Sequence, residues 1–514
     1  MTRAPSLLAV LLLLAGPLSA AVQLASPFTD HMVLQREMPV PIWGTADAGE
    51  SITVEFAGQK KSTTADATGR WRVDLDPLTA SAEPRELIVT SATPKSAVSD
   101  LKSAISDLRL SDVLVGEVWL ASGQSNMDFT VSKSARKWAG VVNEEQEIAA
   151  ANHPLVRMFT GGTQMAYTPQ VTLPGEWKVC SPETVSDFSA LGYFFARDLQ
   201  RELQVPVGIL TLSYGASCAH AWIRRDAMLA DPDFRAVLDR FDTQVKGRVP
   251  PTEAELKDWE AAAELAKAEL RRPPPKPGAD PVQDQHNPTV MFNGMIAPVV
   301  PYALRGVLWY QGESITSPRE LFPRWNALLI TDWRALWGRE LTFLFCQLAA
   351  LDGKGNIPEV RAWQAEALKL PGTGMAVTID VGDETNVHPK DKAPVGDRLM
   401  RLALAHAYGR ALESSGPVFV SSFIEGAALR LRFSHLGGGL VAKGGPLQTF
   451  ELAGADGKFV PAEAVIEGDT VVVRSTAVPT PVAARYAWSN YPIGCNLFNA
   501  AGLPAAPFVA TPKP

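Results

Sequence analysis

The sequence has few of the residues that build disulfide frameworks or zinc-binding folds. Its 514 residues include only four cysteines, which are widely spaced and form no CxxC pair: Cys180, Cys218, Cys346 and Cys495. This pattern excludes a zinc ribbon and argues against a disulfide framework. It leaves open one or two disulfides in an oxidising compartment, or four small side chains buried as hydrophobic residues.

The sequence also lacks a concentration of positive charge. The formal net charge is −7 at pH 7, and the acidic residues are scattered along the chain. Because there is no basic patch, nucleic acid is not an expected partner. The seven histidines and the acidic residues show no HExxH-type spacing. We therefore expect neither a metal nor another cofactor.

Long apolar runs are missing beyond the start of the chain. Arg3 precedes the apolar run Leu7–Leu14, and the small residues that follow end at Ala20. This order is typical of a secretory signal peptide, placed here at residues 1–20, and it predicts a secreted or periplasmic protein with no membrane span after cleavage. The alternative is an N-terminal membrane anchor, for which the apolar run is short.

The patterning of apolar residues divides the chain into three regions, in keeping with a length suited to two or three domains. Residues 21–110 alternate apolar and polar positions between turns, which predicts a β-rich domain, read as a small β-sandwich. Residues 111–414 alternate buried strand-like runs with helix-like stretches, which favours an α/β fold with a parallel sheet. Within them, residues 250–285 form a helical and proline-rich excursion. Residues 415–514 are β-rich again.

A serine follows one of the strand-like runs of the α/β region. In GEVWLASGQSNMDF, residues 116–129, the apolar run gives way to small polar residues around Ser125. A helix beginning there offers free N–H groups and a positive dipole end to a developing oxyanion. The stretch is not a GxSxG elbow, because Met127 stands where the elbow has glycine. Ser125 is therefore either a nucleophile or a helix cap.

One histidine is placed to act as a base for such a serine. In VTIDVGDETNVHPKDK, His388 follows an apolar strand through a polar loop, and Pro389 then stiffens the chain. The alternative is a surface loop histidine. The remaining histidines stand in loop, turn, helical or late β contexts: His31, His153, His220, His286, His406 and His435.

Two further strand-like runs end in groups that can donate a hydrogen bond. ILTLSYGAS ends near Gly215, and GVLWYQGES ends at Gln311 and Glu313. Parallel strands present their carboxyl ends at one edge of a sheet, so these groups are expected near Ser125. Polar strand ends together with a loop histidine are a constellation that suits acyl transfer.

Several blocks of this sequence, taken together, are typical of one protein family. LASGQSNM, MFNGMIAP, WYQGES and VHPKDKAPVGDRL lie in order within about residues 24–508, and they resemble the bacterial sialate O-acetylesterase family of the SGNH hydrolase superfamily. The resemblance implies a flavodoxin-like α/β/α catalytic domain with accessory β-sandwich modules.

The resemblance also assigns roles to particular residues. It matches Ser125 to the family nucleophile, which also donates its backbone N–H, and His388 to the family base. Gly215 and Gln311 match the other two donors of the oxyanion hole. Glu313 matches an acidic residue of the QGES block, for which we expect a supporting, orienting role.

The chain departs from the family where the acid of a Ser-His-Asp triad is expected. Thr385 and Asn386 stand at the positions, three and two residues before His388, where relatives often have Asp. Asp383 or Glu384 is the candidate to replace that acid, with a backbone carbonyl as the alternative. A second departure is Ile315, where relatives commonly have Asn, and it is expected to alter the substrate pocket.

The sequence thus predicts a secreted serine esterase that removes O-acetyl groups from a sugar or glycan, most simply sialic acid. Two alternatives stay open. The same machinery can act on acetylated xylan or another plant polysaccharide, because specificity lies in pocket loops. A site that has lost its triad acid can also belong to a carbohydrate-binding protein without catalysis. Exposed tryptophans can stack on sugar rings, although core packing is their commoner fate.

Overall fold

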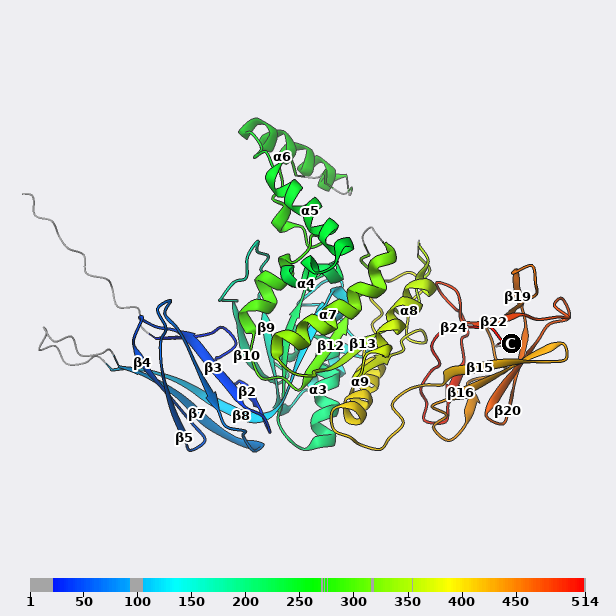
Figure 1. Cartoon of the computed structure of the whole chain (residues 1–514), viewed down its shortest axis with the longest axis horizontal. Helices are drawn as coiled ribbons and strands as arrows, with labels where there is room; N and C mark the ends of the chain where they lie inside the picture. The colour runs from blue at the N-terminus through cyan, green and yellow to red at the C-terminus, as the bar shows by residue number, and fades with distance from the viewer. Residues whose placement is uncertain are drawn as a thin grey trace, which may run out of the picture.

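The computed structural model describes residues 22–92, 105–269, 271, 273–274, 276–315, 319–353 and 355–512. The predicted signal peptide, residues 1–20, lies outside the described residues. Three regions follow one another along the molecule, with an α/β domain between two β-rich ones (Figure 1). Within the described ranges, no helix has the length and apolar character needed to cross a membrane.

The N-terminal region is built from two sheets that pack around an apolar core. The pattern of burial in Ser51–Phe56 and Arg70–Leu75 alternates residue by residue, as expected of strands with one face on a core. One sheet has the order β1-β3-β6, while β4 pairs with β5 and β7 in the other. The strands are β1 (Gln23–Leu24), β2 (Val33–Gln35), β3 (Val40–Thr45), β4 (Ser51–Phe56), β5 (Gln59–Thr64), β6 (Arg70–Leu75) and β7 (Ser81–Ala92).

A single long strand, β8 (Ile105–Gly123), joins this region to the α/β domain. Its first part pairs antiparallel with β7, and its last part, from Glu117 on, pairs parallel with β11 and β12. The expected boundary between residues 110 and 111 therefore falls inside one strand.

The α/β domain has a mostly parallel sheet of order β10-β9-β11-β8-β12-β13-β14, in which only β10 runs antiparallel to its neighbour. The strands are β9 (His153–Gly161), β10 (Gly175–Cys180), β11 (Val207–Ser213), β12 (Gly306–Tyr310), β13 (Thr342–Cys346) and β14 (Thr373–Ala376). The central strands β11, β12 and β13 are buried along their whole length. Such continuous burial is what helices on both faces of a parallel sheet produce.

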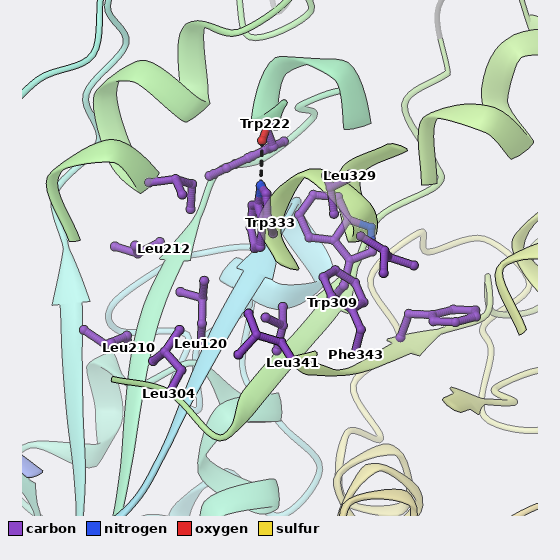
Figure 2. Close-up of a cluster of buried hydrophobic side chains, with 14 of the residues drawn as sticks. Leu120, Leu210, Leu212, Trp222, Leu304, Trp309, Leu329, Trp333, Leu341 and Phe343 are labelled. Carbon is purple, nitrogen blue, oxygen red and sulfur yellow. Dashed lines mark hydrogen bonds between the residues drawn. The ribbon is translucent and has the colours of Figure 1, made fainter. Parts of the chain in front are cut away.

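Helices cover both faces of this sheet, because successive side chains of β8 point into two different cores. Trp119 points into the core with α3 (Ala190–Leu203) and α9 (Ala393–His406). Leu120 points into the opposite core, where Trp309 and Trp333 pack together and Trp333 Nε1 donates to the Trp222 carbonyl (Figure 2). Trp333 comes from α7 (Phe322–Trp337). Further helices of the domain are α1 (Ser125–Asp128), α2 (Glu144–Ala149), α4 (Arg225–Leu229), α5 (Pro232–Lys246) and α8 (Ile357–Ala365). The arrangement is the predicted α/β fold.

The excursion expected at residues 250–285 contains α6 (Glu253–Ala268), which with α5 stands away from the body of the domain (Figure 1). Thr252 and Glu255 form a capping box at its first turn. The helix is exposed along nearly its whole length, Ala266 being its one buried residue. The α/β pattern resumes after it at β12.

The C-terminal region consists of sheets of order β15-β16-β21-β20, β17-β23 and β19-β18-β22-β24. Its strands are β15 (Val418–Glu425), β16 (Ala428–Ser434), β17 (Leu440–Ala442), β18 (Phe450–Ala453), β19 (Phe459–Pro461), β20 (Glu463–Glu467), β21 (Thr470–Arg474), β22 (Ala483–Tyr486), β23 (Leu497–Asn499) and β24 (Phe508–Ala510). One link to the α/β domain is Arg361 of α8, a buried guanidinium that donates to the carbonyls of Ser489 and Asn490 as well as to two in its own domain.

Three of the four cysteines, Cys180, Cys218 and Cys346, are buried in the α/β domain, and Cys495 is half-buried in the C-terminal region. The thiols of Cys180, Cys346 and Cys495 are free. Burial raises the pKa of the Cys180 thiol to about 12. These side chains therefore serve as small apolar residues, which is one of the two alternatives left open by the sequence.

Candidate active site

Ser125 lies at a sharp turn between β8 and α1. Gly123, the last residue of β8, has φ +133°, and a Cβ added there would lie 2.2 Å from the Tyr310 carbonyl oxygen. Glycine is therefore required, and it lets Gln124 N donate to that same oxygen at 2.9 Å. The turn places Ser125, which is half-buried, at the first position of α1, at the carboxyl edge of the sheet.

The end of β11 brings Gly215 beside the serine. A Cβ built on Gly215 would lie 3.7 Å from the Cβ of Ser125. Among the described residues, neither the Ser125 nor the Gly215 backbone N–H has a hydrogen-bond partner. Two unused backbone donors in residues that lie beside one another suit the binding of an oxyanion.

Gln311 comes to the same edge at the end of β12, but its side chain is already engaged. Its Nε2 donates to the carbonyls of Ser217, at 3.3 Å, and Ser314, at 2.9 Å. Donation to an oxyanion would require one of these bonds to break, so a place for Gln311 in the oxyanion hole stays a prediction. In this structure the amide ties two loops to the end of β12.

The loop that carries His388 is joined to the Ser125 segment by a hydrogen bond between residues adjacent to each of them. Asn126 Nδ2, one residue after Ser125, donates to the carbonyl of Val387, one residue before His388, at 3.0 Å. Residues 261 positions apart in the chain are thereby joined. No hydrogen bond between Ser125 Oγ and the His388 ring is present in the described part of the chain. Catalytic hydrogen bonds are often long before substrate binds.

The half-buried His388 ring has an aromatic neighbour and no acidic one. Its centroid lies 4.5 Å from that of Trp138, at an interplanar angle of 37°. Burial, followed by the charge of Lys392, lowers the pKa of His388 to about 4. No carboxylate of the described residues hydrogen-bonds to the imidazole. The ring is therefore neutral at physiological pH and free to accept a proton.

The two residues that stand in the triad acid's place, together with Asp383, stabilise the loop instead. Asp383 Oδ1 accepts the backbone N–H groups of Thr385 and Asn386, each at 2.9 Å, and these bonds lower the pKa of its carboxyl. Asn386 Oδ1 in turn accepts the N–H of His388 at 2.9 Å. Asp383 thus acts on the loop that carries His388, not on its ring.

Glu313 and Lys392 form a buried network with Asn126. Asn126 Nδ2 donates to Glu313 Oε1, and Lys392 Nζ donates to Asn126 Oδ1, both at 2.5 Å. Burial raises the pKa of Glu313 and lowers that of Lys392 to about 7. Glu313 Oε2 is buried and has no hydrogen-bond partner among the residues that the structure describes.

A cavity of about 220 Å³ lies beside this network, at the ends of β12 and β13. Glu313, Asn386 and Asn356 supply polar groups to its wall, and Ile315 and Leu348 supply apolar ones. The departure from the family pattern at Ile315 therefore stands in the wall of a cavity that borders the network of Glu313 and Asn126. No cluster of three His, Cys, Asp or Glu residues suited to a metal occurs in the described ranges.

Comparison with known proteins shows that the chain is similar to carbohydrate esterases along nearly its whole length. The chain is 33% identical to a carbohydrate acetylesterase from Xanthomonas citri of known crystal structure, with a TM-score of 0.78 over 95% of this chain and 99% of that one. It is 29% identical to the sialate O-acetylesterase of Rattus norvegicus and 28% to that of Homo sapiens. Each match covers 95% of this chain, and 94% and 92% of those proteins. No protein-family model matches the chain.

This chain belongs to the sialate O-acetylesterase family. The near-complete coverage of the Xanthomonas citri structure extends the likeness to the β-rich regions at both ends as well as to the α/β domain. The family resemblance inferred from the sequence blocks is thereby confirmed, as is the α/β fold class with accessory β modules.

Three residues of the candidate site were not singled out from the sequence. Asn126 and Lys392 lie within the GQSNM and VHPKDK blocks, so the blocks themselves contained the signal, but not the contact between them. Trp138 lies in a stretch without any motif, and its position against His388 depends on the folded chain.

Proposed function

We propose that this member of the sialate O-acetylesterase family removes O-acetyl groups from a carbohydrate, with Ser125 as the nucleophile and His388 as the base. The observation that carries the proposal is the hydrogen bond from Asn126 to Val387, because it joins the segments of Ser125 and His388 at one sheet edge. The free N–H groups of Ser125 and of Gly215 beside it support the same chemistry, because they can donate to an oxyanion.

The reaction follows from these positions. His388 accepts the Ser125 hydroxyl proton while Oγ bonds to the acetyl carbonyl carbon, and the two N–H groups hold the oxyanion. The intermediate collapses by breaking its bond to the sugar oxygen, which takes the proton from His388 and leaves. Water then attacks the acetyl-serine with His388 as base, and the serine and acetate are released.

The direct test is the Ser125→Ala variant, assayed with p-nitrophenyl acetate. We expect hydrolysis to fall to background, and thermal unfolding to stay at the wild-type midpoint. Equal rates for variant and wild type would contradict the serine mechanism, and if both rates lie at background they would favour a carbohydrate-binding protein without catalysis. Acetate release from acetylated sialic acid and from acetylated xylan then decides which carbohydrate is the substrate.

We also propose that the protein is exported, because residues 1–20 have the order of a signal peptide. The mass of the protein recovered from the periplasm or medium of an expressing cell tests this. We expect a mature chain that begins close to Ala21. Recovery of the intact chain from the cytoplasm alone would contradict export.

A further inference from the structure

The mechanism leaves one buried set of polar side chains unused. Asn126 and Lys392 are each only 1% exposed, although the lysine carries an ammonium group. Its neighbours are the amide oxygen of Asn126, at 2.5 Å, and the rings of Phe129 and Tyr310, with centroids 4.8 and 5.5 Å from Nζ. Burying an ammonium group with so few partners is costly, so its contact with Asn126 calls for an explanation.

The network fixes the orientation of one amide. Lys392 can only donate, so it holds the Asn126 oxygen, and Glu313 accepts from the Asn126 nitrogen. The second proton of that nitrogen is then directed at the carbonyl of Val387, 3.0 Å away. A rotated amide would place its oxygen against a carboxylate and its nitrogen against an ammonium group.

We propose that Asn126, locked by Glu313 and Lys392, is a positioning residue that sets the approach of His388 to Ser125. The inference rests on the proposed function, because it assumes these two residues react together. Asn126 is the chain neighbour of one, and Val387 is the chain neighbour of the other. Among the described residues no carboxylate orients the imidazole of His388. The hydrogen bond from Asn126 to the adjacent Val387 carbonyl orients it instead.

A double-mutant cycle with Asn126→Ala and His388→Ala tests this. If Asn126 acts through His388, Asn126→Ala lowers kcat about 10²-fold in the wild-type background and leaves KM within about twofold. In the His388→Ala background the same change has little further effect, because there is no base left to position. Equal fold losses in both backgrounds, or an undiminished kcat for Asn126→Ala alone, would overturn the proposal.

A second variant and a control protect the test. If Asn126→Ala fails to fold, Lys392→Met replaces it in the same cycle, since it releases the amide oxygen while filling a similar volume. Asn499→Ala is the matched control, because Asn499 is equally buried and its amide also bonds to carbonyls distant in the chain, those of Ser415 and His435, but it lies in the C-terminal region. It should leave kcat unchanged; a loss equal to that of Asn126→Ala would make the effect one of general disturbance.

The two proposals fail differently in these assays. Full activity in Ser125→Ala or His388→Ala contradicts the proposed function itself. Loss of activity in both, together with additive losses in the cycle, contradicts only the positioning role of Asn126.

Discussion

Replacing Gly123 with alanine should disable the site by moving its backbone, although the residue carries no chemistry. Gly123 has φ +133°, and an added Cβ would lie 2.2 Å from the Tyr310 carbonyl oxygen, far inside the closest approach of real Cβ atoms. That oxygen belongs to β12 and accepts the N–H of Gln124. The chain can relieve the overlap only by separating β8 from β12 just before Ser125.

The energetic cost of the Gly123→Ala change has two parts. Holding alanine in a backbone conformation suited to glycine costs about 1–3 kcal/mol. Loss of the hydrogen bond between Gln124 and Tyr310 costs on the order of 1 kcal/mol. A total near 3 kcal/mol corresponds to a drop of about 5 °C or more in the unfolding midpoint of the domain. A shift of about 1 Å in Ser125 lowers kcat by roughly 10²-fold.

The matched control is Gly215→Ala, on the other side of Ser125. There the added Cβ would lie 3.7 Å from the Cβ of Ser125, an ordinary contact, and the backbone N–H remains. We expect its unfolding midpoint to move by less than about 1 °C, and p-nitrophenyl acetate hydrolysis to survive. Calorimetry and steady-state kinetics on both variants measure the difference. A Gly123→Ala protein with the wild-type midpoint and kcat would refute the reasoning.

Four further predictions concern the base and the domain contact. Because burial lowers the pKa of His388 to about 4, log kcat/KM should stay level down to about pH 5 and fall below it, and Lys392→Met should move that fall to higher pH. In the unfolded chain His388 binds a proton near its ordinary pKa of about 6.5, whereas in the folded protein it stays neutral down to about pH 4. The free energy of unfolding should therefore decrease as the pH drops from about 6.5 toward 4. Trp138→Leu should lower kcat about 2–30-fold, because the indole face stabilises the positively charged imidazolium of His388. An unchanged kcat would show that Trp138 does not stabilise it. Arg361→Met should reduce the free energy of unfolding by about 3 kcal/mol, seen in denaturant titration, because it removes the hydrogen bonds from a buried guanidinium to four carbonyls.

The sequence predicted the part of the site that depends on local pattern. Ser125 and Gly215 each follow a continuous apolar run, and parallel strands carry such positions to one edge. His388 was predicted in the same way, because it follows an apolar run through a polar loop. What joins these segments is a bond between Asn126 and Val387, across 261 positions, and no local pattern contains it. Burial of Lys392 was equally invisible, since lysine is almost always exposed.

The boundary between the first two regions shows how a local pattern can mislead. Near residue 110 the chain changes from alternating to continuous hydrophobicity, which is read as a new domain. In the structure β8 runs straight through this point, and what changes is its partner. The strand leaves a sheet with one exposed face at β7 and enters a sheet covered on both faces at β11 and β12. A change of burial within a strand gives the same signal as a change of domain.

The missing acid and the low pKa of His388 belong together. A carboxylate beside an imidazole stabilises its charged form, whereas burial and the Lys392 ammonium group here favour the neutral one. Such a ring is a poor base in the resting enzyme. In the mechanism that we propose, attack by Ser125 creates an oxyanion within the same partly buried site, and its negative charge raises the proton affinity of His388 at that moment. The base then becomes strong only when substrate is present and correctly placed. An enzyme of this kind depends on geometry more than on a permanent charge pair, and a rigid link from Asn126 to the histidine loop supplies that geometry.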